Sequence, residues 1–343
     1  MILGVELSYW QQTILRVVLG LTAVLLPAGT LVYAYLFKAV SFMQSRLGPM
    51  EAGPYGSMQL LAEVGKFLQK EDIVPTRADR VLFKLAPFVV LVSTFLLVLV
   101  VPFSLDDTFI NADTGIYLAM AVSSISVIGI LMAGWASANK YSLMGGIRAA
   151  GQLIAYELPM ILAVVGVVIQ AGTLNMNGIV YAQWNGEIFG WGGIGNPYIL
   201  TQFVGFLIFL IAVQAELTQT PFDMPIAESE LVAGYLTEYS GLRFLLFFIG
   251  EFATMGIFSL IASVLFLGGW TIPWGLHFDS NVYNVLGPLV MMGKMMIVAF
   301  LVVWARFSFP RFREDQLQRL AWKFLIPLSL GNIVATAILK VVF

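Results

Sequence analysis

The sequence predicts an all-α, polytopic membrane protein with about eight transmembrane helices and an amphipathic helix on the cytoplasmic side. Composition is the first observation behind this prediction. Hydrophobic residues make up 59% of the 343 residues and charged residues only 11%, whereas soluble domains carry about 25% charged residues. The mean hydropathy of +0.88 is the second observation. A chain with so few charges cannot cover a soluble globule of this length, so lipid must contact much of its surface.

The third observation is that apolar stretches long enough to cross a bilayer recur along the whole chain. A transmembrane helix needs about 20 consecutive, largely apolar residues. No internal repeat divides the chain, so we expect one integral membrane domain over residues 1–343. The predicted spans are 14–36, 81–103, 116–133, 154–171, 199–215, 242–267, 285–305 and 322–342.

Lysine and arginine residues are concentrated in alternate connections between these spans. The connections 37–80, 134–153 and 306–321 are basic, whereas the intervening connections contain neither residue. Because basic loops stay in the cytoplasm, this pattern predicts that both termini lie outside. The connection 216–241 is cytoplasmic by parity but contains only acidic charges, so something other than topology determines its composition.

Within the first of these connections, apolar residues recur at helical spacing over about 57–70. Leu60, Val64 and Phe67 share one face, and Glu63 lies opposite them. The pattern is typical of an amphipathic helix that lies in the membrane interface. A helix packed on the surface of a partner protein would show the same pattern, and both alternatives remain open.

The residues that the chain lacks exclude several kinds of site. There is no cysteine, so the chain forms no disulfide, ligates no iron–sulfur cluster and has no cysteine nucleophile. His277 is the only histidine, which excludes a polyhistidine metal or haem site. We therefore expect no metal site, no covalent catalytic residue, no cofactor bound by this chain alone and no nucleic-acid partner.

Ionisable residues lie inside several predicted spans, where they are costly unless they face a partner or a wet cavity. Glu251 and Lys294 lie near the middle of their spans, which favours a functional role. A static ion pair between these two residues is the structural alternative. Glu157 lies about one turn inside its span and Glu216 lies at the inner end of another. For these two, a side chain that reaches interfacial water is an equally good interpretation.

The connection 216–241 reads ELTQTPFDMPIAESELVAGYLTEYSG and contains five carboxylates. A run of charges is usually a solvated face, but here prolines, aromatic residues and aliphatic residues are interspersed with the acids. That mixture is typical of a folded, partly buried element. Carboxylates held close together share protons, so the segment could take part in a proton relay. The five acids are Glu216, Asp223, Glu228, Glu230 and Glu238.

Three stretches resemble the membrane subunit of respiratory complex I that forms much of its quinone chamber. They are RLGPMEAGPYGSMQLLAEVGKFLQKEDIVPTRADRVLFKLAP at 46–87, GWASANKYSLMGGIRAAGQLIAYELP at 134–159 and AELTQTPFDMPIAESELVAGYLTEYSG at 215–241. FFIGEF at 247–252 and PRFREDQLQRLAWKFLIP at 310–327 also match. The resemblance covers nearly the whole chain in order, within the wider superfamily of complex I and related hydrogenases.

The resemblance implies a quinone cavity and a chain of carboxylates that runs from it toward the central membrane. The cavity would be lined by Arg46, Gln219, Phe222 and Asp223. Lys294 is a further candidate for the relay because of its depth in its span. The matching carboxylates are Glu63, Glu157, Glu216, Glu228, Glu230, Glu238 and Glu251.

The resemblance also implies the partners and the location. The expected partners are peripheral-arm iron–sulfur and quinone-site subunits, small membrane subunits, antiporter-like subunits, the lipid bilayer, and a quinone substrate such as ubiquinone or menaquinone. A bacterial inner membrane is the expected location, ahead of an organelle inner membrane.

Several positions depart from the family pattern. The family usually has Glu-Arg-Lys at the end of the first span, where this chain has Leu36, Phe37 and Lys38. It usually has Asn at Met50, Arg at Gln219 and Glu at Ile226. These differences leave two alternatives open: a divergent complex with an altered quinone, and a hydrogenase-type or ferredoxin-linked complex without one. A stand-alone secondary transporter would require two related halves with broken helices, and none is found.

Overall fold

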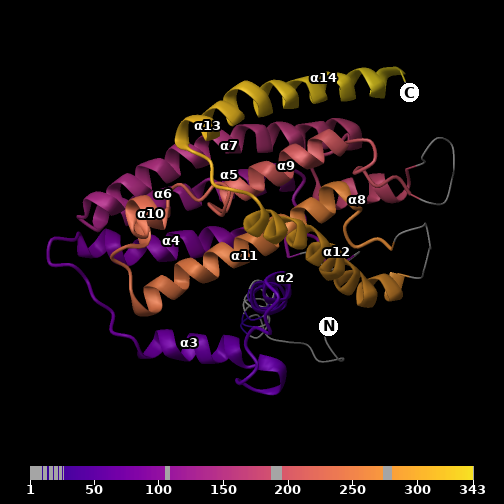
Figure 1. The fold of residues 1–343 in the computed structure, drawn as a ribbon. Coiled ribbons are helices and arrows are strands. Elements are labelled where there is room, and N and C mark those ends of the chain that lie inside the picture. The colour runs from indigo at the N-terminus through magenta and orange to yellow at the C-terminus, as the bar shows by residue number, and fades with distance from the viewer. Residues whose placement is uncertain are drawn as a thin grey trace.

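The computed structural model describes residues 27–104, 109–186, 195–272 and 280–342, together with isolated residues among the first 26. Every regular element in these ranges is helical, which confirms the predicted all-α fold (Figure 1). The elements are η1 (Val32–Ala39), α2 (Val40–Met43), η2 (Pro54–Gly56), α3 (Gln59–Gln69), α4 (Arg80–Val98), α5 (Gly115–Ser123), α6 (Ile125–Ala136), α7 (Lys140–Ala171), α8 (Met176–Trp184), α9 (Phe203–Glu216), α10 (Glu228–Leu231), η3 (Gly234–Leu236), α11 (Gly241–Phe266), α12 (Ser280–Ser308), α13 (Glu314–Leu320), η5 (Ala321–Leu325) and α14 (Ile326–Val342).

Six helical stretches in the described ranges are long and apolar enough to cross a membrane. The shorter apolar helix α9 falls on the predicted span 199–215. Most of the predicted span 14–36 lies outside the described residues, although residues 27–36 are helical. The chain is therefore a polytopic membrane protein. The six stretches are Arg80–Val98, Gly115–Ala136, Lys140–Ala171, Gly241–Phe266, Leu286–Ser308 and Glu314–Val342.

The largest difference from the predicted spans is at α7, which begins at Lys140 instead of 154. The side chain of Asn139 caps the helix by accepting a hydrogen bond from Tyr141 N. Close packing on α6 continues through this polar first part, because a Cβ atom added to Gly146 would lie 3.1 Å from Gly134 Cα. Hydropathy missed these turns because they are helical without being apolar throughout.

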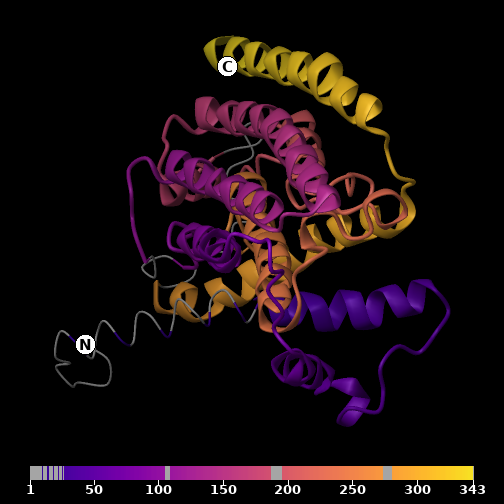
Figure 2. The same ribbon diagram turned by 90° about the vertical axis from the view of Figure 1, so that its left-hand side faces the viewer.

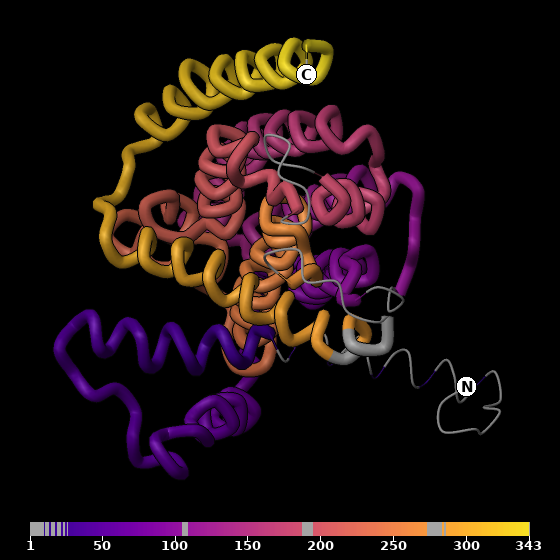
Figure 3. Tube along the Cα trace, turned by 90° about the vertical axis from the view of Figure 1, so that its right-hand side faces the viewer, coloured from indigo at the N-terminus to yellow at the C-terminus, as the bar shows by residue number. Residues whose placement is uncertain are grey.

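Helix α11 lies at the centre of the bundle and is the most buried of the six stretches. It packs against α4 and α12, while α7 packs against α6, α9 and α14. Helix α14 lies along one edge of the molecule and α3 lies at the opposite edge (Figures 1 and 2). The tube in Figure 3 shows the same separation from the other side. The first part of α7, the end of α9 and the start of α11 therefore meet around residues 217–240, the segment that joins α9 to α11.

Helix α14 is the least buried of the six stretches, but polar contacts attach it to the bundle. Asn332 Nδ2 donates to Gln202 Oε1 at 2.9 Å, and Gln202 Nε2 donates to Thr336 Oγ1 at 2.7 Å. Nearer the end of the helix, Lys340 Nζ donates to the carbonyl oxygen of Ile169 at 2.5 Å. These contacts join α14 to α7 and to the start of α9.

Residues 59–69 of the predicted amphipathic segment form α3. Its Phe67 ring stacks on Phe244 of α11 with the centroids 5.6 Å apart. Leu61 and Leu68 remain more than half exposed in the isolated chain. Both a membrane interface and a partner protein would cover these apolar side chains, so both alternatives remain.

Candidate functional site

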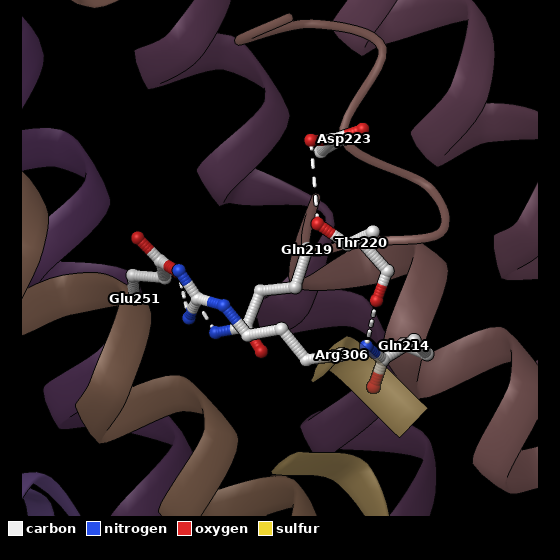
Figure 4. Close-up of polar contacts among 6 residues, drawn as sticks. All are labelled: Gln214, Gln219, Thr220, Asp223, Glu251 and Arg306. Atoms are coloured by element: carbon white, nitrogen blue, oxygen red, sulfur yellow. Dashed lines mark hydrogen bonds and ion pairs between the residues drawn. The ribbon is translucent and has the colours of Figure 1, made fainter. Parts of the chain in front are cut away.

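The site is built on the turn that follows α9, residues 217–226. The side chain of Gln152, from α7, donates one hydrogen bond to the carbonyl oxygen of Ala215 in the last turn of α9, at 2.7 Å, and one to that of Phe222 in the turn, at 2.8 Å. Gln214 Nε2 donates to the carbonyl oxygen of Thr220 at 2.6 Å (Figure 4). Two buried amides therefore fix the backbone of the turn from inside the bundle.

Glu251 of α11 points toward this turn. Its Oε1 accepts a hydrogen bond from Gln219 Nε2 at 2.8 Å and lies 3.3 Å from Arg306 Nη1 of α12 (Figure 4). About a quarter of each charged side chain is exposed in the isolated chain. The counter-charge of Glu251 is therefore Arg306, and the sequence-based alternative of a pair with Lys294 is wrong.

Lys294 of α12 has a different set of partners. Its Nζ donates to three backbone carbonyl oxygens just beyond the end of α11, those of Leu267 at 2.7 Å, Gly269 at 2.8 Å and Thr271 at 2.7 Å. These carbonyls follow the C-terminal end of a helix, where the backbone dipoles favour a cation. Depth in adjacent spans suggested a pair with Glu251, but the two side chains lie at different heights along α11.

Asp223 lies at the far end of the same turn. Arg311 Nη2, from the segment after α12, is 2.7 Å from Asp223 Oδ2. Thr220 Oγ1 contacts the same oxygen at 3.3 Å, and Arg311 also donates to Ser229 Oγ at 3.3 Å. Asp223 is thus an ion-paired side chain that connects the turn to the segment before α13.

Two further acids of the segment are bound by residues of α7 and its cap. Arg148 Nη1 is 2.7 Å from Glu230 Oε2, and Arg148 Nε is 3.8 Å from Glu314 Oε2 of α13. Asn139 Nδ2 donates to Glu238 Oε1 at 2.5 Å. The acidic segment is therefore a folded element rather than a freely solvated loop. The sequence prediction did not include the arginine partners of the acidic segment. The concentration of basic residues in the loops 134–153 and 306–321 is the sequence feature that could have indicated them.

Glu157 and Glu216 lie near each other between α7 and α9. Ser124 Oγ donates to Glu157 Oε1, and the charge of Glu157 acts on Glu216. Both acids are partly buried. They lie on two helices, α7 and α9, that pack against each other.

Other predicted residues lie apart from this group. Glu228 is exposed at the start of α10. Glu63 lies on α3, where it accepts from Gln59 Nε2 at 3.3 Å. Arg46 is exposed and donates to Gln44 at 2.8 Å. The structure therefore brings Gln219, Asp223, Glu230, Glu238 and Glu251 around one segment, but not Glu63 or Arg46.

Phe222 is buried, with 3% of its surface exposed. Its ring lies 5.1 Å from Tyr156 of α7 and 5.5 Å from Phe312 between centroids. Phe312 N also donates to the carbonyl oxygen of Pro221 at 3.1 Å. In the isolated chain Phe222 thus packs the turn against α7 and the segment before α13.

Within the described ranges, no group of three histidine or acidic side chains is placed to hold a metal ion. The chemistry that the arrangement supports is movement of protons and charge between carboxylates. Burial and the Glu251 carboxylate hold the pKa of Tyr235 above its ordinary value, so this neighbouring phenol stays protonated.

Comparison with known proteins shows the family of the chain. The family described as NADH dehydrogenase matches residues 15–337. The H subunit of NADH-quinone oxidoreductase from Bacillus thuringiensis subsp. konkukian is 46% identical, over 94% of this chain and 94% of the relative. The same subunit from Bacillus mycoides is 44% identical with the same coverage. That of Brevibacillus brevis is 41% identical over 96% of this chain and 94% of the relative. The chain therefore belongs to the family of the NADH-quinone oxidoreductase H subunit and is a membrane subunit of this oxidoreductase complex.

Proposed function

We propose that this subunit forms much of the quinone-binding cavity of a proton-pumping complex and carries a carboxylate relay toward the antiporter-like subunits. The observation that carries the proposal is the contact between Gln219 and Glu251. It joins a turn that matches the family's quinone cavity to a carboxylate deep in a membrane-spanning helix. The names of the relatives, which include a quinone as substrate, support the same interpretation.

Reduction of a quinone to a quinol consumes two electrons and two protons. The electrons would arrive through iron–sulfur clusters of partner subunits, because this chain has no cysteine to ligate one. Removal of protons near the turn changes the charge that acts on Glu230 and on the Glu157–Glu216 pair. Interacting carboxylates respond by exchanging protons with one another. Glu251 would then pass the change toward the central membrane.

Lys294 is left out of the proposed relay. Its three hydrogen bonds go to backbone carbonyl oxygens, which neither gain nor lose protons. Its contacts favour a structural role at the end of α11.

The proposed partners are the iron–sulfur and quinone-site subunits of a peripheral arm, the small membrane subunits and the antiporter-like subunits. The proposed location is a bacterial inner membrane with both termini outside. The basic connections of the sequence support this orientation.

A second candidate is the equivalent subunit of a hydrogenase-type or ferredoxin-linked complex. Four neutral side chains favour it, because the family usually has charged residues there: Leu36, Phe37, Gln219 and Ile226. Purification through a tag on this chain separates the two candidates. We expect iron–sulfur subunits to co-purify and the complex to reduce a quinone with NADH. An intact complex that oxidises its donor but reduces no quinone would favour the second candidate.

A further inference from the structure

One partner of Glu251 is an amide, which distinguishes this carboxylate from a simple ion pair. Gln219 Nε2 and Arg306 Nη1 both contact Glu251 Oε1. The other polar atom of the amide, Gln219 Oε1, is buried and has no hydrogen-bond donor among the described residues. Gln219 is 2% exposed, so bulk water does not reach it. A buried acceptor without a donor is costly, and its position next to a carboxyl group requires an explanation.

An amide can satisfy either protonation state of a carboxyl group. A carboxylate only accepts hydrogen bonds, whereas a protonated carboxyl group also donates one. The observed orientation, with Nε2 toward Glu251, suits the carboxylate. Half a turn of the amide about its last bond brings Oε1 toward Glu251, where it can accept from the protonated acid. Arginine has no acceptor, so it can donate to the carboxyl group but cannot accept from the O–H of the protonated acid.

We propose that Gln219 is a positioning residue for proton transfer at Glu251, with an amide that donates to the carboxylate and turns to accept from the protonated acid. This inference rests on the proposed function, in which Glu251 gains and loses a proton during turnover. The proton passes between Glu251 and the other relay carboxylates. Gln219 itself neither gains nor loses one.

The surroundings of Glu251 are consistent with this division of roles. Arg306 of α12 only donates and supplies the counter-charge. Tyr235 of η3, the other titratable group on which Glu251 acts, stays a protonated phenol. The backbone of the turn is fixed by Gln152 and Gln214. The amide of Gln219 can therefore turn while its backbone stays in place.

Infrared difference spectra of the intact complex, oxidised against reduced, test the inference. The signal is the C=O stretch of a protonated carboxyl group that Glu251→Gln removes. In Gln219→Arg we expect the amplitude of this band to fall by about tenfold, because an adjacent cation favours the carboxylate. In Gln219→Met we expect the band to persist at a higher wavenumber, because the acid O–H has lost its acceptor.

Gln183→Met is the matched control. It removes a buried amide that donates to the carbonyl oxygen of Val264 and does not contact the turn or Glu251. We expect it to leave the band unchanged. Unchanged amplitude and wavenumber in both Gln219 variants would overturn the inference, while loss of pumping in Glu251→Gln would still support the relay. If the wild-type spectrum contains no band that depends on Glu251, the relay fails and the inference fails with it.

Discussion

Glu251 and Lys294 are two ionisable side chains on adjacent helices of one bundle, and their surroundings differ in kind. Glu251 faces side chains, an amide and a guanidinium, that can rotate or be withdrawn. Lys294 faces three backbone carbonyls, which can do neither. The two sites are separated along α11 by about 24 Å, at 1.5 Å per residue from 251 to 267. An ionisable side chain whose partners can move can gain or lose a proton during turnover. One that is held by fixed backbone dipoles is kept in a single protonation state.

The largest effect is expected from Glu251→Gln, which keeps the shape of the side chain but removes its titration. We expect the complex to assemble normally and quinone-linked proton pumping to fall by about tenfold or more. Glu251→Asp should retain part of the pumping because the carboxylate survives. Proton uptake and release by reconstituted vesicles measures the effect.

Asp113→Asn is the control for Glu251→Gln, because it removes an exposed carboxylate outside the acidic segment. Pumping at the wild-type rate in Glu251→Gln would remove Glu251 from the relay. The side chain would then be a structural partner of Arg306, and the difference from Lys294 would disappear.

Lys294→Met should affect stability instead. It leaves three carbonyl oxygens at the end of α11 without their donor, and we expect a loss of about 3 kcal/mol in the free energy of unfolding. The midpoint of thermal inactivation of the purified complex should fall, while pumping per assembled complex stays close to the wild-type value.

Lys340→Met is matched to Lys294→Met because Lys340 donates to a single carbonyl at an exposed position. We expect it to cost less than about 1 kcal/mol. Normal stability of Lys294→Met together with lost pumping would return Lys294 to the relay.

Phe222→Ala tests the turn on the Glu251 side. Truncation of a buried phenylalanine costs about 3–5 kcal/mol, so its effect must be measured per assembled complex. We expect quinone reduction to fall by about tenfold, because the turn loses its contacts with Tyr156 and Phe312 and misplaces the groups beside it. Donor oxidation with an artificial acceptor should persist.

Phe209→Ala makes the same truncation on the Lys294 side, where Phe209 packs on Phe266 at the end of α11. It should lower stability without a specific loss of quinone reduction. Equal losses of quinone reduction in the two variants would show that both act only through packing.

The smallest effect is expected from single cysteines at Ser57 and Ser280, which serve as labels and should leave activity intact. The absence of native cysteine keeps the labelling specific. We expect the two positions to react from opposite sides of the membrane, because Ser57 lies in the basic connection 37–80, whereas Ser280 lies in a connection, 268–284, that has no lysine or arginine. Reaction of both from one side would refute the predicted topology.

Hydropathy was sufficient to predict the six long apolar stretches and the shorter helix α9, because lipid selects for apolar length directly. It missed the start of α7 because the first turns of this helix carry Lys140 and Arg148 and are not apolar throughout. Glu251 was found from its cost in an apolar span, and the acids of 216–241 were found from their concentration in one connection. The arginine partners of these acids were not found, since Arg148 and Arg306 come from distant parts of the chain. The direction in which a side chain points from its helix, and its height in the bundle, are set by packing. Depth in a span alone could not separate Lys294 from Arg306 as the partner of Glu251.

The polar contacts along α14 have a mechanical consequence. A force applied at the C-terminal end would first load the contact of Lys340 with Ile169, then those of Gln202 with Thr336 and Asn332. With few buried side chains to share the load, the helix should peel away from α7 in short steps at low force. The central helix α11, which is enclosed by its neighbours, should yield last and in one event.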